Sequence, residues 1–130
     1  MTHVATCHCG SFRLEVDQLP EAAVICNCSF CTKRGALWGY YDRAEVRITA
    51  NSTDAIYAPN SARPSHNKHH FCLACGCTTF SVTPNWLAQY TQGAEPKEDA
   101  QLAVNLRLLD DFDIDALPIE RVDGRKGWGE

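Results

Sequence analysis

The eight cysteines of this 130-residue chain gather in three tight clusters, and their spacing constrains the fold more than any other feature. The clusters are Cys7-His8-Cys9-Gly10, Cys26-Asn27-Cys28-Ser29-Phe30-Cys31 and Cys72-Leu73-Ala74-Cys75-Gly76-Cys77. Four thiolates close a structural zinc site, whereas three leave one coordination position open for chemistry. The pattern therefore predicts two zinc sites, one closed and one open.

The closed site is predicted from two cysteine pairs that are each followed by a glycine. Cys72-x-x-Cys75 has the form of a zinc knuckle, in which two sulfurs point to one ion from a tight turn. A glycine after the turn tolerates the positive φ that lets backbone N–H groups face the thiolates. Cys7-x-Cys9 offers a matching pair, and the assignment of these four cysteines to one zinc ion rests partly on the family resemblance given below.

The open site is predicted at Cys26, Cys28 and Cys31, because three ligands from six consecutive residues can cap one face of a tetrahedral ion. The fourth position could hold water, an exogenous thiolate or a protein ligand. An open zinc would lower the pKa of a bound thiol and deprotonate it near neutral pH. Lys33 and Arg34 follow at once and could balance the charge of the site, receive a substrate carboxylate, or simply be solvated cations.

Several other residues admit both a functional and a structural interpretation. Cys77 is either a fourth thiolate for the second zinc or, as we favour, a small buried residue in a strand. The histidines near the cysteines are interpreted as packing or hydrogen-bonding neighbours rather than ligands. Trp38, Tyr40 and Tyr41 are interpreted as core or half-core residues, whereas Trp86 and Tyr90 are candidates for lining a pocket.

The apolar residues mostly form short runs between polar turns, which predicts an all-β chain. The clearest alternation lies in residues 12–16 and 102–108, and further strands are expected at 22–25, 36–41, 45–49, 55–58 and 79–82. Residues 59–68 are expected to form a surface loop, 84–100 a long irregular stretch and 113–117 a helical turn.

Length and charge limit the remaining possibilities. A chain of 130 residues is most simply one domain spanning 1–130, and its net charge of −4 argues against a nucleic-acid partner. No apolar run approaches the roughly 20 residues needed to cross a bilayer, and residues 1–6 lack the features of a signal peptide. We therefore expect a cytoplasmic protein without a membrane partner, in which clustered cysteines bind metal rather than form disulfides.

The chain resembles the glutathione-dependent formaldehyde-activating enzyme family, also called the Gfa/CENP-V family. The resemblance is carried by C-H-C-G at residues 7–10, C-x-C-S-x-C at 26–31 and F-C-x-x-C-G at 71–76, together with Val104-Asn105-Leu106-Arg107 and Leu109-Asp110. It covers residues 6–123, and Cys77 departs from the family, which more often carries Ser or Thr there.

The resemblance implies small twisted antiparallel sheets that a structural zinc holds together. This fold is shared with a zinc-binding chaperone of Rab GTPases. It implies a structural zinc on Cys7, Cys9, Cys72 and Cys75, and a catalytic zinc on Cys26, Cys28 and Cys31. The implied activity is that of a carbon–sulfur lyase, which adds glutathione to formaldehyde to give S-hydroxymethylglutathione, or performs the reverse reaction.

The expected partners are therefore a small-molecule thiol and a small carbonyl compound. Lys33, Arg34 or residues near Trp86 and Tyr90 would hold the glutathione carboxylates. Two alternatives remain open at this stage: a non-enzymatic zinc-containing binding module, and a carrier of glutathione or zinc that performs no turnover. The oligomeric state is not predicted by the sequence.

Overall fold

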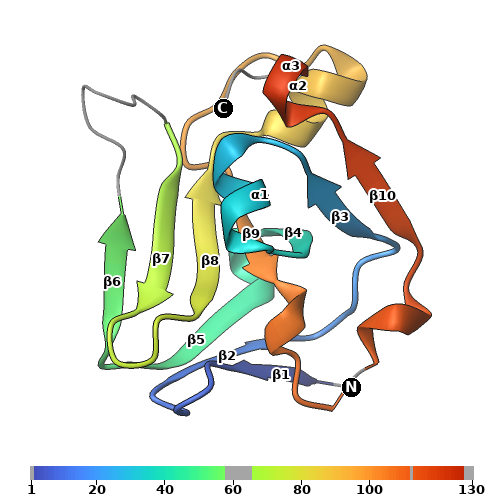
Figure 1. Cartoon of the computed structure of the whole chain (residues 1–130). Helices are drawn as coiled ribbons and strands as arrows, with labels where there is room; N and C mark the ends of the chain where they lie inside the picture. The colour runs from blue at the N-terminus through green and yellow to red at the C-terminus, as the bar shows by residue number, and fades with distance from the viewer. Residues whose placement is uncertain (1, 58–65, 112, 128–130) are drawn as a thin grey trace.

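The computed structural model describes residues 2–57, 66–111 and 113–127, and most of them lie in two β-sheets (Figure 1). The smaller sheet has the strand order β1-β2-β5, and the larger has the order β10-β3-β4-β9-β8-β7-β6. Strand β10 runs parallel to β3, and the other pairings between the described strands are antiparallel. The prediction of an all-β fold is confirmed.

The elements have the following bounds. The smaller sheet contains β1 (His3–Thr6), β2 (Phe12–Val16) and β5 (Val46–Asn51). The larger contains β3 (Ala23–Cys26), β4 (Trp38–Asp42), β6 (Asp54–Tyr57), β7 (Lys68–Cys72), β8 (Thr78–Thr83), β9 (Gln101–Asn105) and β10 (Ile119–Val122). The helices are α1 (Ser29–Arg34), α2 (Trp86–Gln92) and α3 (Gly124–Gly127), with 3₁₀ turns at Arg43–Glu45, Leu106–Leu108 and Ile114–Ala116.

The core lies on both faces of the larger sheet. On one face, Phe80 and Val104 pack in a cluster with Phe12 and Leu14 of the smaller sheet. On the other face, Ala103 belongs to a second cluster, against which α1 packs. All six residues of β8 are buried as a result, so the inner strands carry apolar and small polar residues on both sides.

Strand β2 matches its predicted bounds, because Phe12, Leu14 and Val16 are fully buried and the residues between them are partly exposed. The predicted strand 102–108 was wrong at its end, since β9 stops at Asn105 and a 3₁₀ turn follows. Asn105 causes this change: its Oδ1 accepts from the Arg107 N–H, and its Nδ2 donates to the Thr78 carbonyl.

The stretch 84–100 was expected to be irregular but contains helix α2, which begins after Asn85 and ends at Gly93. The backbone of Gly93 has a φ of 64°, a left-handed conformation that suits glycine at a helix end. The Asn85 Oδ1 accepts from the Lys97 N–H at 2.8 Å, which folds the following segment back against the helix. The turn expected at 113–117 is present as Ile114–Ala116.

Some predictions fall outside what the structure tests. The loop expected at 59–68 lies largely outside the described residues. None of the helices in the described part of the chain is long and apolar enough to cross a membrane. The single-domain interpretation of residues 1–130 stays a prediction.

Candidate metal centres and active site

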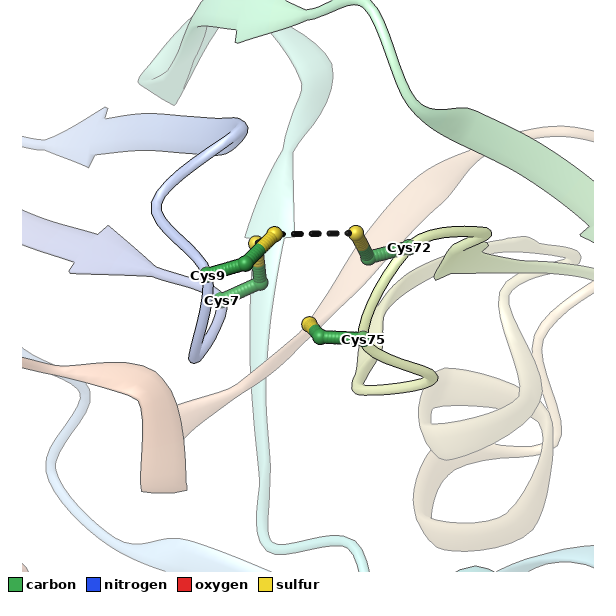
Figure 2. A group of neighbouring side chains, drawn as sticks. All are labelled: Cys7, Cys9, Cys72 and Cys75. Atoms are coloured by element: carbon green, nitrogen blue, oxygen red, sulfur yellow. Dashed lines mark hydrogen bonds between the residues drawn. The ribbon is translucent and has the colours of Figure 1, made fainter.

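Four cysteine sulfurs meet between the two sheets (Figure 2). Cys7 and Cys9 lie in the connection between β1 and β2, Cys72 ends β7, and Cys75 lies in the turn before β8. All four Sγ atoms lie within 4.8 Å of one another, with Cys7 to Cys9 at 3.6 Å and Cys9 to Cys72 at 3.7 Å. Because a tetrahedral zinc with Zn–S bonds of about 2.3 Å separates its sulfurs by about 3.8 Å, this donor set fits a zinc ion.

The two turns that supply these sulfurs are built alike. The Gly10 N–H donates to the Cys7 carbonyl at 3.0 Å, and the Gly76 N–H donates to the Cys72 carbonyl at 2.7 Å. Their backbones have φ values of 82° and 80°, which glycine adopts without the steric cost that a side chain brings. The two halves of the site are therefore matched zinc knuckles from distant parts of the chain.

The surroundings of the four thiols favour a bound cation. The Phe12 N–H donates to the Cys7 Sγ at 3.3 Å, and the Thr53 Oγ1 lies 3.1 Å from the Cys72 Sγ. Burial raises the pKa of the Cys7 thiol to about 11, whereas the backbone N–H of Cys77 helps to lower the pKa of Cys75 to about 5. A bound divalent cation would stabilise the thiolate form of all four cysteines at once.

Cys77 belongs to neither cysteine group. It follows Cys75 in the same turn, interacts with the Cys75 thiol, and packs partly buried against the main core. This position favours the interpretation of Cys77 as a packing residue over its interpretation as a fourth ligand for the second zinc.

A second group is formed by Cys26, Cys28 and Cys31, whose Sγ atoms also lie within 4.8 Å of one another. Cys26 ends β3, Cys28 is the N-cap of α1, and Cys31 lies in its first turn. The Cys28 Sγ accepts from the Cys31 N–H at 3.3 Å, which fixes the start of the helix. The Trp38 Nε1–H donates to the Cys31 Sγ at 3.2 Å, which orients the third sulfur.

The three thiols share charge unequally. Hydrogen bonds from the Cys28 and Cys31 thiols lower the pKa of Cys26 to about 3, and the same contacts raise the pKa of Cys31. Of these two thiols, Cys26 is thus the one that ionises more readily. A zinc ion would replace the thiol protons, so this group could also bind zinc.

A small open pocket of about 30 Å³ lies beside the three-cysteine group. Besides the three cysteines it is lined by aromatic and small polar side chains, among them Trp38, Tyr40, His69, Ser81, Thr83 and Trp86. The prediction that Trp86 lines a pocket is confirmed, whereas the side chain of Tyr90 lies outside the described residues. Trp38 and Tyr40, interpreted from the sequence as core or half-core residues, also line this pocket.

The floor of the pocket is a single row of cross-strand neighbours. His69 of β7 pairs with Ser81 of β8, Ser81 pairs with Ala103 of β9, and Ala103 pairs with Tyr40 of β4. Paired residues of adjacent strands lie on the same face of the sheet, so all four point toward the pocket side. Helix α1 lies across this face (Figure 1), and its Phe30 ring stacks on His69 with centroids 3.5 Å apart.

Comparison with known proteins identifies the family. A family described as "Glutathione-dependent formaldehyde-activating enzyme" matches residues 2–104. The chain belongs to this family. A crystal structure of a Rhodobacter sphaeroides protein has the same fold, with a TM-score of 0.65 and 24% sequence identity over 90% of this chain and 99% of that one. No match was found among the curated proteins.

The segment 104–107 supports helix α1. Asn105 accepts from the Leu37 N–H just beyond the helix, and the Arg107 Nε donates to the Gly35 carbonyl at 2.8 Å. Gly35 ends α1 with a φ of 65°, so the Arg107 side chain holds the turn that closes the helix. Through this contact the segment helps to position the three-cysteine group.

Lys33 and Arg34, the two cations predicted to bind glutathione, lie exposed in the last turn of α1. The Arg34 guanidinium lies 5.2 Å from the centroid of the Phe30 ring and donates to the Thr78 Oγ1 at 3.4 Å. Neither residue lines the pocket itself. Their role in this family member stays a prediction.

Proposed function

We propose that the protein is a zinc-dependent carbon–sulfur lyase. It would add glutathione, or a related thiol, to formaldehyde or a similar small carbonyl compound, giving an S-hydroxymethyl adduct, or catalyse the reverse reaction. The observation that supports this proposal most strongly is a group of three thiols at the edge of an open pocket, which no fourth ligand joins among the residues that the structure describes. The description of the family supports the choice of glutathione and formaldehyde.

In this proposal Cys26, Cys28 and Cys31 are the catalytic zinc ligands. A zinc ion held there would supply the Lewis acidity that keeps an added thiol ionised near neutral pH. The thiolate is the form of a thiol that attacks a carbonyl carbon. Trp38 holds the Cys31 sulfur by its Nε1–H, and the pocket leaves room for a substrate beside the three sulfurs.

Cys7, Cys9, Cys72 and Cys75 would hold the structural zinc. Cys7 and Cys72 are separated by a long segment of chain. A metal ion that joins the two ends of such a loop stabilises the folded state, because it reduces the conformational entropy of the unfolded chain. The site would fasten the turn between β1 and β2 to the turn between β7 and β8, which belong to different sheets. Its function is then in folding and not in the reaction.

Lys33 and Arg34 are proposed to receive the carboxylates of glutathione. Both are exposed in the last turn of α1, a few residues after Cys31. A guanidinium binds a carboxylate through two parallel hydrogen bonds, and stacking on Phe30 would hold Arg34 ready for that contact. The eight free thiols also support a cytoplasmic location, where cysteines remain reduced.

The test is the rate of S-hydroxymethylglutathione formation, measured by exchange NMR with zinc-loaded protein after subtraction of the spontaneous reaction. We expect acceleration by the wild type and its loss in Cys28→Ser. Cys77→Ser is the matched control, since it removes a thiol that belongs to neither group. A wild type that binds two zinc ions without accelerating the reaction would refute the lyase, and glutathione binding without turnover would identify a carrier instead.

A further inference from the structure

His69 places an unused polar atom beside the three-cysteine group. Its side chain is 5% exposed, and its Nδ1 lies 2.8 Å from the Ser81 Oγ. Its other ring nitrogen, Nε2, is buried without a hydrogen-bond partner among the described residues. A buried polar atom without a hydrogen-bond partner destabilises the folded protein. The position of Nε2 at a pocket therefore indicates that a bound ligand supplies the missing partner.

The tautomer of His69 follows from its neighbour. Ser81 is 1% exposed, and the His69 Nδ1 is the partner that the structure gives its hydroxyl. If Ser81 donates its O–H to Nδ1, the imidazole proton lies on Nε2 and one buried donor remains unused. The reverse assignment would leave both the serine hydrogen and the Nε2 lone pair without partners, so the Nε2–H form satisfies more groups.

The position of the ring is fixed on several sides. Phe30, between two of the cysteines on α1, stacks on His69 at a centroid distance of 3.5 Å and an interplanar angle of 9°. Tyr57 is the cross-strand partner of His69 on its outer side, and Ser81 on its inner side. His69 is not a member of the three-cysteine group, so the ring lines the pocket without occupying a ligand position.

We propose that His69 is a catalytic residue, and that its Nε2–H hydrogen-bonds the carbonyl oxygen of the electrophile. This inference rests on the proposed function. The pocket places the ring beside the thiols, so a small carbonyl compound held there would have its carbon toward the attacking sulfur and its oxygen toward Nε2. A donor placed where negative charge develops is the usual source of rate enhancement in additions to carbonyls.

The step balances without an added oxidant or reductant. The substrate thiolate forms a new bond from sulfur to the carbonyl carbon, and the π electron pair of the carbonyl moves onto its oxygen. The Nε2–H stabilises that oxygen, which then takes a proton from water in the open pocket. The hydroxide left behind is neutralised by the proton that the thiol released on ionising, so the product is the hydroxymethyl thioether.

The kinetic test compares His69→Phe and His69→Gln with His70→Gln, all zinc-loaded. His70 is a matched control because it is also stacked on a phenylalanine and hydrogen-bonded, but it points to the opposite face of β7. We expect kcat to fall on the order of 100-fold in His69→Phe, with less loss in His69→Gln, which keeps an N–H donor. The KM for glutathione and a content of two zinc ions are expected to remain, and loss of the second zinc in both His69 variants would show a ligand role instead.

A binding test separates this inference from the lyase itself. Zinc-loaded protein is titrated calorimetrically with 2-mercaptoethanol and with propane-1-thiol, which has a methyl group in place of the hydroxyl. The preference for the hydroxyl-bearing thiol is expected to be about tenfold greater in the wild type than in His69→Phe. Equal preferences in the two proteins overturn the assignment of Nε2, whether or not the protein catalyses the addition.

The combined outcomes are distinct. Acceleration by the wild type with unchanged kcat in His69→Phe and His69→Gln overturns the role of His69 and leaves the lyase in place. A wild type that shows no acceleration but has the His69-dependent preference refutes the lyase and supports His69 as the partner of a ligand oxygen. A His69→Phe protein that does not fold is replaced by His69→Gln in both tests.

Discussion

The indole Nε1–H of Trp38 donates a hydrogen bond to the Cys31 Sγ at 3.2 Å. The bond links β4 of the larger sheet to helix α1, and it orients the three-cysteine group from outside its own segment. Hydrogen bonds of this kind hold a ligand atom in place and lower the electron density on a thiolate.

Trp38→Phe is therefore expected to weaken the second zinc site while keeping the fold. The ring remains to fill the core, but the sulfur loses its donor, and loss of such a partner typically costs 10- to 100-fold in metal affinity, about 2 kcal/mol. Competition with a chelator measures the affinity of each site. An unchanged second site would contradict the orienting role of Trp38.

The two cysteine groups are expected to differ in their effect on stability. Cys72→Ser removes a ligand from the site that joins the two sheets, so we expect the Tm to fall by about 10 °C or more. Cys28→Ser removes a ligand from a site within one short segment, so we expect a fall of less than about 4 °C. Thermal unfolding followed by circular dichroism measures both. Equal losses would contradict the division into a structural and a catalytic site.

Gly76→Ala is expected to destabilise the protein by about 1 to 2 kcal/mol. Nothing lies within 4 Å of the position that a Cβ would take, so the cost comes from the φ of 80° and not from a clash. Gly76→Asn is the control, because asparagine tolerates this region of backbone space better than alanine. Urea unfolding gives both values, and a larger loss in Gly76→Asn would show that another factor acts at this turn.

His69 is expected to stay neutral at pH values where a free histidine ionises. Burial lowers the pKa of its imidazole from 6.5 to about 4. Between these values the unfolded chain binds a proton that the folded chain does not, so this group contributes less stability as the pH falls from 6.5 toward 4. An NMR titration of the His69 ring signals measures the midpoint, and a midpoint near 6.5 would show that the ring is solvated.

The spacing within each pair predicted two half-sites, Cys7 with Cys9 and Cys72 with Cys75, because ligand spacing within one turn is local. Their assignment to one ion rested partly on the family resemblance, and the structure brings all four sulfurs within 4.8 Å. The alternation in residues 12–16 predicted β2 with its observed bounds, because one of its faces is buried and the other is partly exposed.

The pocket could not be predicted in the same way. The row formed by His69, Ser81, Ala103 and Tyr40 exists only through the register of four strands, and register is a property of pairing rather than of any one segment. The sequence placed His69 near the third cysteine cluster, outside every predicted strand, and such a histidine was interpreted as a packing or hydrogen-bonding neighbour; strand β7, which carries it, was not predicted. The end of β9 was missed for a related reason, since the Asn105 side chain redirects a chain whose alternation continues to Leu108.

The most direct test of the account is the number of thiolates bound to metal with and without glutathione. In the cobalt-substituted protein, the sulfur-to-cobalt charge-transfer absorption reports each metal–thiolate bond. We expect absorption from seven cysteine thiolates in the protein alone, and growth by one further thiolate when glutathione is added. That growth should be absent in Cys28→Ser. Absorption that is already complete without glutathione, or that does not change when it is added, would contradict an open site that receives the substrate thiol.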